Sequence, residues 1–63
     1  MYNIWELSFG GMEKISVHET EKEAIETHSA YEDRIGYPSQ EIYVIEDTSS
    51  GKFSRYGEII DLN

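Results

Sequence analysis

Two histidines, His18 and His28, are best suited to proton transfer or metal binding, because histidine titrates near neutral pH without help. Residues 18–22 (HETEK) start like the zinc-binding H-E-x-x-H helix motif, but a lysine replaces the second histidine. His28 and Glu32 have the spacing of two ligands on one helix, whereas a structural zinc site needs about four ligands. Residues 47–51 resemble a calcium loop, but their glycine comes one place early and their oxygen ligands are too few. We therefore predict no metal site and no cofactor.

The sequence contains no recognisable nucleophile site. No serine stands in a G-x-S-x-G or S-x-x-K pattern, and no glycine-rich phosphate loop is present. Paired carboxylates, as at 32–33 and 46–47, are expected by chance on an acidic surface. A chain of 63 residues also has difficulty enclosing a ligand pocket, which usually measures roughly 300 to 1,000 Å³. We therefore predict that the protein is not an enzyme.

The charge balance is strongly acidic. Thirteen Asp and Glu residues against five Lys and Arg give a formal net charge of −8, and 38% hydrophobic residues argue against disorder. Such a surface repels phosphates, so direct binding to nucleic acid is not expected. The charge can steer the protein toward a basic partner, or it can simply keep a small protein soluble.

The length of 63 residues predicts a single domain, 1–63. A core of this size is marginal unless something supplements it, and the absence of cysteine removes disulfides. A well-packed core or a homodimer remains. No apolar stretch is long enough for a membrane span and no hydrophobic leader opens the chain, so we expect a cytoplasmic protein that does not bind membranes.

The first 18 residues predict a β-hairpin. Residues 2–9 and 12–18 are rich in β-formers and are separated by Gly10-Gly11. A two-residue loop at these glycines would pair Leu7 with a lysine. A longer or bulged turn, 10–12, pairs Leu7 with Ile15 and gives one coherent apolar face, so we predict that register.

Residues 21–35 predict one amphipathic helix. Thr20 to Glu23 has the form of a capping box, and Gly36 and Pro38 are suited to ending the helix. The apolar stripe consists of Ala24, His28, Tyr31 and Ile35, with Ile25 at its edge. We expect His28 to make a hydrogen bond to the sheet, and His18, at the end of the second strand, to be exposed.

Residues 41–47 and 53–62 predict the last two strands, the second of them broken at Gly57 by a bulge. A tight turn at Ser50-Gly51 would place Glu46 beside Arg55. It would also place Ile45 beside Tyr56. The expected fold is therefore α+β, in the order ββαββ, with a four-stranded antiparallel sheet and one helix packed on one face.

Candidate partner-binding residues follow from the surplus of tyrosines. If Ile42, Val44 and Ile59 face the helix, alternation turns Tyr43 and Tyr56 toward the opposite face of the sheet. We call this uncovered side the open face. The inverse assignment stays open, because both faces of these strands carry apolar residues. Tyrosine is enriched at protein interfaces. The candidates are Tyr43, Asp47, Tyr56 and Glu58 on the open face, with Glu26 and Asp33 on the acidic helix face.

The leading hypothesis is a small acidic protein-interaction module. A specific form of it is an inhibitor or nucleic-acid mimic of phage or mobile-element type that docks on a basic protein partner, by analogy of size and charge alone. The alternative is a homodimeric structural protein that uses its open sheet face. A small-ligand or metal-binding module is the third and least favoured hypothesis.

Overall fold

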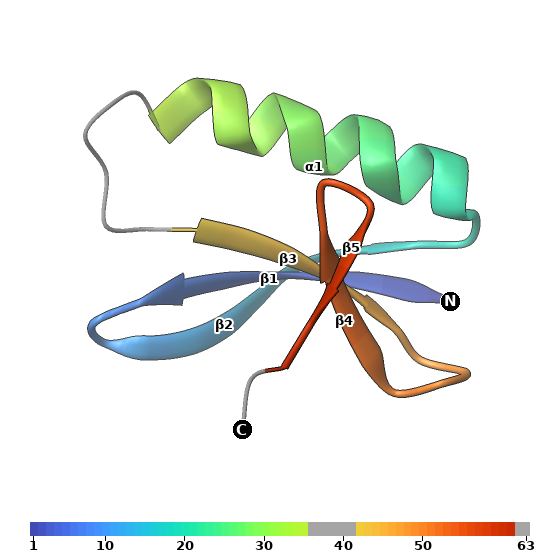
Figure 1. Ribbon diagram of the computed structural model, residues 1–63. Helices are drawn as coiled ribbons and strands as arrows, with labels where there is room; N and C mark the ends of the chain where they lie inside the picture. The colour runs from blue at the N-terminus through green and yellow to red at the C-terminus, as the bar shows by residue number, and fades with distance from the viewer. Residues whose placement is uncertain (36–41, 62–63) are drawn as a thin grey trace.

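The computed structural model describes residues 1–35 and 42–61, which form five strands and one helix. These elements are β1 (Tyr2–Ser8), β2 (Gly11–His18), α1 (Glu21–Ile35), β3 (Ile42–Asp47), β4 (Lys52–Arg55) and β5 (Glu58–Ile60). The expected α+β fold, with one helix on an antiparallel sheet, is confirmed (Figure 1). The predicted number of four strands was wrong, because the last predicted strand is divided into β4 and β5. The expected helix-ending residues Gly36 and Pro38 lie outside the described residues.

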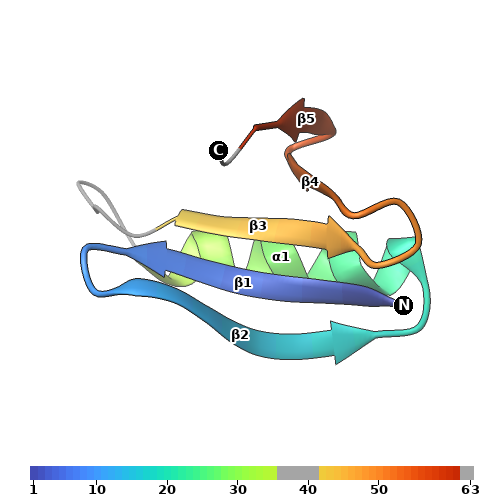
Figure 2. The same cartoon turned by 90° about the horizontal axis from the view of Figure 1, so that it is seen from below.

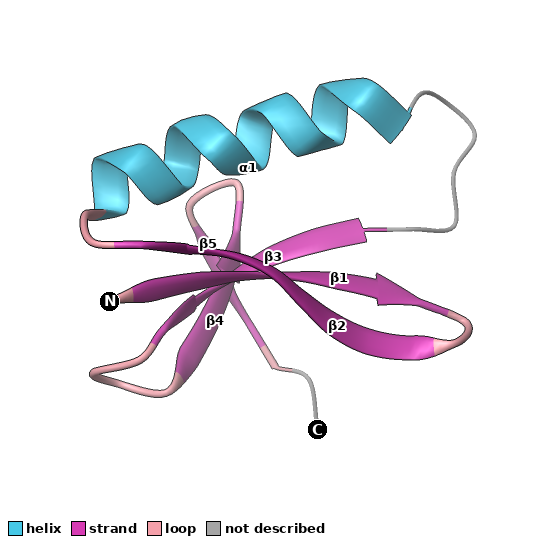
Figure 3. Ribbon diagram, turned by 180° about the vertical axis from the view of Figure 1, so that it is seen from behind, coloured by secondary structure: helices cyan, strands magenta, loops and turns pink. Residues whose placement is uncertain are grey.

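All neighbouring strands in the sheet are antiparallel, in the order β2-β1-β3-β4-β5. Strands β2, β1 and β3 lie side by side with α1 along one face, and β4 and β5 turn away from β3 (Figure 2). The view from behind shows the same arrangement, with α1 crossing above the sheet (Figure 3). Helix α1 packs on β1, β2 and β3. No helix in the described part of the chain is long and apolar enough to cross a membrane.

The register of the first hairpin differs from the prediction. Leu7 pairs with Met12 and Ser8 with Gly11, so the connecting loop is Phe9-Gly10. Gly11 has a φ of 120°, which residues with a side chain rarely adopt, and this explains why a glycine stands there. A bulge lies inside β2, where Ile15 is the extra residue between two pairs. The predicted three-residue turn and the pairing of Leu7 with Ile15 are therefore wrong, although the bulge still brings Ile15 to the core.

Helix α1 begins as the sequence predicts. The backbone N–H of Glu23 donates to Oγ1 of Thr20, and the N–H of Ala24 donates to the carbonyl of Thr20. Substituting such an N-cap residue by alanine costs about 1 kcal/mol. The other half of the expected capping box is replaced by a different contact, because the Glu23 carboxylate pairs with His18.

The core lies between α1 and the first three strands. It consists of Ile4, Ala24, Tyr43 and Ile45, with Tyr2, Ile15 and Tyr31 packed against it. Burying a side chain such as that of Ile4 contributes about 1.5 to 3 kcal/mol. The Tyr31 and Tyr43 rings are stacked with their centroids 5.2 Å apart.

The two faces of β3 are the inverse of the predicted assignment. Ile4 pairs with Ile45 beneath the helix, so Tyr43 also faces α1, whereas Val44 pairs with Trp5 on the opposite face. Alternation within β3 could not decide between the faces, because Tyr43, Val44 and Ile45 are all buried. The pairing with β1 decided it.

The C-terminal hairpins also have registers that the sequence analysis did not anticipate. Glu46 pairs with Phe53 and Asp47 with Lys52, so the loop between β3 and β4 is 48–51 and Glu46 does not lie beside Arg55. The expected bulge at Gly57 is a tight turn, in which Arg55 pairs with Glu58. That turn divides the predicted fourth strand into β4 and β5 and produces the fifth strand.

Candidate functional site

A groove of about 540 Å³ lies between α1 and the β4–β5 hairpin. Its apolar lining comes from Tyr2, Ile25, Ile45, Tyr56 and Ile59, and its charged lining from Glu21, Asp47 and Lys52. The volume falls within the range of ligand sites, although so short a chain was expected to have difficulty enclosing one. The groove exists because α1 covers only the first three strands, while β4 and β5 turn away beside it (Figure 2).

Three large apolar side chains along this groove are well exposed. Ile25 is 49%, Tyr56 65% and Ile59 67% exposed. They come from the helix, from a turn and from an edge strand, so only the tertiary fold brings them together. Single exposed apolar residues need no explanation, but a group of them beside a groove is typical of a binding surface.

Tyr56 occupies an unusual backbone position. In the tight turn between β4 and β5, Tyr56 has a φ of 52° and Gly57 a φ of 80°. Turns with positive φ at both central residues favour Asn-Gly, and a tyrosine there costs about 1 kcal/mol. The Tyr56 ring meets the His28 ring edge-on, with centroids 5.3 Å apart, and the Arg55 guanidinium lies 5.1 Å from its centre. Backbone strain of this kind concentrates at functional sites.

An ion pair connects the β4–β5 hairpin to the helix. Arg55 donates from Nε and Nη2 to the two carboxylate oxygens of Glu32, at 2.9 and 3.1 Å. The Glu32 side chain is only 6% exposed, and its Oε1 also accepts from the backbone N–H of Tyr43. Burial alone would raise the pKa of Glu32, but the hydrogen bonds from Arg55 and Tyr43 outweigh it and the pKa lies below its usual value. The same contact raises the pKa of Arg55.

His28 has the structural role that the sequence predicts. It is buried, and its Nε2 lies 2.7 Å from the carbonyl oxygen of Tyr43. Because a carbonyl only accepts, Nε2 carries the proton. Glu32 Oε1 lies 3.3 Å from the same nitrogen. His28 therefore forms part of the support beneath the groove, with only its contact to Tyr56 reaching the rim.

His18 was expected to be exposed, and this was wrong. Its side chain is 11% exposed, since it pairs with Tyr2 on the helix face of the sheet and lies below the first turn of α1. Its Nδ1 is 3.0 Å from the Glu23 carboxylate, and its Nε2 is 2.9 Å from the Ser16 hydroxyl. Within residues 1–35 and 42–61, no group of His, Asp and Glu side chains is arranged to hold a metal ion.

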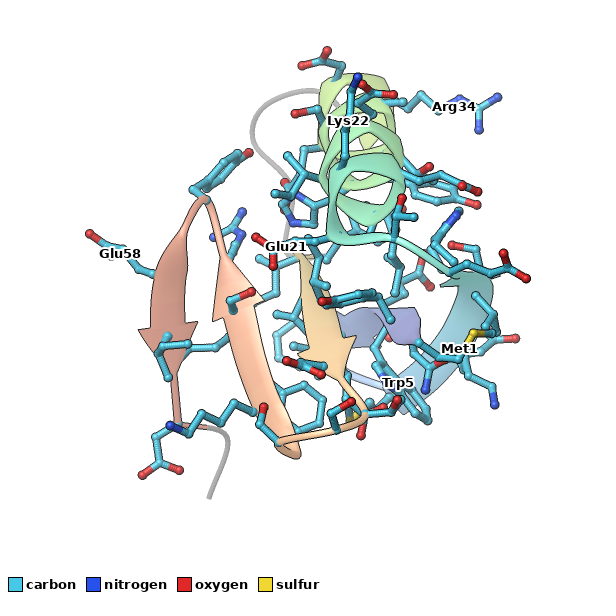
Figure 4. The ribbon with its side chains drawn as sticks, turned by 90° about the vertical axis from the view of Figure 1, so that its right-hand side faces the viewer. Met1, Trp5, Glu21, Lys22, Arg34 and Glu58 are labelled. Carbon is cyan, nitrogen blue, oxygen red and sulfur yellow. The ribbon has the colours of Figure 1, made fainter. Side chains whose placement is uncertain are left out.

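The structure divides the candidate partner-binding residues. Asp47 and Tyr56 both line the groove. Tyr43 is buried under the helix and its hydroxyl donates to Glu6, so its placement on the open face was wrong. Glu58 is exposed on β5, where it points away from the rest of the molecule (Figure 4). Glu26 and Asp33 are exposed on α1 but do not line the groove.

Sequence reasoning missed Ile25 and Ile59 as candidates. Ile25 lies at the edge of the apolar stripe of α1. An apolar side chain at that edge, beside the core-facing residues, is the signal that could have identified Ile25 as a binding candidate. Ile59 was expected beneath the helix, because no sequence pattern shows that β4 and β5 turn away from it.

The opposite face of the sheet is partly covered by its own side chains. Trp5 lies on this face, away from α1 (Figure 4). The indole N–H of Trp5 and the amide of Asn3 both donate to Oε1 of Glu46, each at 2.9 Å. These two hydrogen bonds hold the pKa of Glu46 below its usual value. The Glu46 carboxylate on this face is therefore already engaged within the chain.

The described residues thus form a groove with buried and exposed apolar lining residues and with charged groups among them, which is typical of binding surfaces. It contains no nucleophile paired with a base among the described contacts, and its one histidine is engaged by a carbonyl. No family model, no curated protein and no solved structure matches this chain.

Proposed function

We propose that this chain is a small acidic protein-interaction module that docks on a protein partner with a basic surface through the groove between α1 and the β4–β5 hairpin. The observation that carries the proposal is Tyr56, an exposed aromatic residue kept in a turn position that its side chain disfavours. Asparagine or glycine would suit the turn better, and Tyr56 remains 65% exposed although it contacts His28 and Arg55, so most of this side chain is free for a contact outside the chain.

The composition of the groove supports a protein as the occupant. Tyrosine and large aliphatic side chains are typical of the centre of protein interfaces, and charged groups of their rim. Tyr56, Ile25 and Ile59 provide the first kind, and Glu21 and Asp47 provide the second. The net charge of −8 would speed encounter with a basic partner.

Edge-to-edge self-assembly is less favoured than a different partner. Strand β2 lies at one edge of the sheet and carries the bulge at Ile15 and an exposed lysine, Lys14. Strand β5 lies at the other edge and is only three residues long. Bulges, lysines and short edge strands are all features that discourage strand addition.

The proposal is tested by affinity enrichment with matched variants. The groove variant is Ile59→Glu, and the control is Val17→Glu, which places the same charge on the other edge strand at an apolar residue that is 47% exposed. We expect a partner identified by mass spectrometry to be retained by wild type and by the control, and lost by Ile59→Glu. A partner retained equally by both variants would contradict the proposal.

Salt dependence and solution mass separate the specific forms of the proposal. Binding that falls steeply with salt would favour the inhibitor or nucleic-acid mimic, because exposed charges are screened within about 8 Å at physiological ionic strength. Salt-insensitive binding would favour the apolar walls of the groove. A wild-type homodimer in light scattering that Ile59→Glu converts to a monomer would replace the proposal with self-assembly.

A further inference from the structure

The groove has two chemically different ends. Glu21 opens the first turn of α1, and Asp47 ends β3, at the end of the molecule where the N-terminus lies (Figures 1 and 2). Figure 4 shows Glu21 on the side of α1 toward β4, whereas Lys22 points away from the sheet. The other end is formed by the turn at Tyr56-Gly57, beside His28. One end therefore carries the charged lining residues, beside Tyr2, and the other end carries Tyr56 and His28.

The charged end carries an excess of negative charge. Its lining has two carboxylates, those of Glu21 and Asp47, and one ammonium group, that of Lys52, which stands opposite Asp47 across the β3–β4 pair. The lining therefore has one more carboxylate than ammonium groups. An additional cation from a ligand would complete the charge balance of this end, and an additional anion would be repelled.

The two ends are separated by a distance that suits an extended peptide. Glu21 and His28 are seven residues apart on the helix, which is about 10 Å along its axis. In an extended strand, side chains two residues apart point to the same side and are about 7 Å apart. The length of a lysine or arginine side chain covers the remaining distance.

We infer that the groove receives an extended segment of the partner in which an aliphatic or aromatic side chain and a lysine or arginine two residues away both point into it. The apolar side chain packs against Ile25, Tyr56 and Ile59, and the cation lies between Glu21 and Asp47. This inference rests on the proposed function and deepens it, because it names the chemistry of the bound segment.

The test uses three capped heptapeptides with the sequences Gly-Ser-Leu-Ser-X-Ser-Gly, where X is lysine, serine or glutamate. Binding is followed by chemical-shift changes in the ¹⁵N-labelled full chain. We expect the lysine peptide to shift amides of β4, β5 and the first two turns of α1, and to bind about fivefold more tightly than the glutamate peptide. No shift of these amides with any of the three, up to several millimolar, would overturn the inference.

Variants of the protein then test whether the lysine of the peptide binds the carboxylates of Glu21 and Asp47. Asp47→Asn keeps the side-chain oxygen that accepts the N–H of Ser49, so the turn after β3 is preserved. We expect Asp47→Asn and Glu21→Gln to weaken the lysine peptide about twofold to threefold and to leave the serine peptide unchanged. Asp33→Asn, on the exposed face of α1, is the matched control and should change neither. Equal weakening of the lysine and serine peptides would contradict the assignment of the cation.

The outcome is distinguishable from failure of the proposed function. If enrichment of a partner depends on Ile59 but the three peptides bind equally, the groove is an interaction site and the inferred segment chemistry is wrong. If neither the peptides nor the partner depends on groove residues, both the inference and the proposed function are wrong.

Discussion

The three strands under the helix and the β4–β5 hairpin are held in place by different kinds of interaction. Strands β2, β1 and β3 share a core with α1, in which Ile4 and Ala24 are fully buried. The β4–β5 hairpin pairs with β3, and it meets α1 through side chains, mainly the Arg55–Glu32 ion pair and the contact of Tyr56 with His28. We therefore expect the first region to be the more rigid and the hairpin to open more readily.

The largest expected effect comes from deleting core volume in the first region. Ile4→Ala removes a side chain with no exposure, so we expect the free energy of unfolding to fall by about 2 to 5 kcal/mol. Ile59→Ala, in the hairpin, is the contrasting variant and should change it by less than about 1 kcal/mol because that side chain is mostly exposed. Urea unfolding measures both. Similar losses for the two variants would show that the hairpin shares the core.

The second effect concerns the connection between the two regions. Glu32→Gln replaces the carboxylate that binds Arg55 and the N–H of Tyr43, and we expect a loss of about 1 to 3 kcal/mol. The effect on local opening should differ between the two regions. Amide hydrogen exchange should accelerate in β4 and β5 more than in β1 and β3. Asp33→Asn, the adjacent exposed acid, should leave exchange unchanged. Uniform acceleration along the whole sheet would contradict a separate role for the hairpin.

The third effect separates stability from binding at the hairpin turn. Asparagine suits the positive φ of this position, so we expect Tyr56→Asn to leave the free energy of unfolding unchanged or to raise it by up to about 1 kcal/mol. The melting temperature should then stay the same or rise. The loss of the His28 and Arg55 contacts offsets part of that gain. Binding of the lysine peptide should weaken at the same time. A large drop in melting temperature would mean that Tyr56 is kept for the fold and not for a partner.

The smallest effect is the response to acid. The pKa values of Glu32 and Glu46 lie below their usual value of 4.5, so both carboxylates contribute stability above that pH and lose it as the pH falls through their folded pKa values. We therefore expect the melting temperature to be level above about pH 5.5 and to fall below pH 4.5. In Glu46→Gln the melting temperature should fall less on acidification, because one of the two carboxylates is gone. A melting temperature that rises on acidification would contradict the prediction.

The part of the fold that could be predicted is the part with a strong local signal. The helix bounds followed from the Thr20 cap and the apolar spacing, and the buried, hydrogen-bonded role of His28 followed from its place in that stripe. The registers could not be predicted, because a shift of one or two residues changes every pair while the local propensities stay the same. The bulge at Ile15 and the turn at Tyr56-Gly57 were missed for this reason.

The candidate site was predicted only in part. Asp47 and Tyr56 were chosen and do line the groove, whereas Tyr43 was chosen for the wrong face and Ile25 and Ile59 were not chosen. The predicted strands 41–47 and 53–62 carry apolar residues on both faces, so alternation carries little information there.

The amino-acid sequence by itself determined an acidic chain with an α+β fold, because composition, hydrophobic period, caps and turn residues act locally along the chain. Only the tertiary structure decided where the groove lies and which residues line it. Ile25 is far in sequence from Tyr56 and Ile59, and it meets them because β3 pairs with β1 beneath the helix while β4 and β5 turn away from it. Such positions depend on long-range pairing, which local patterns do not specify.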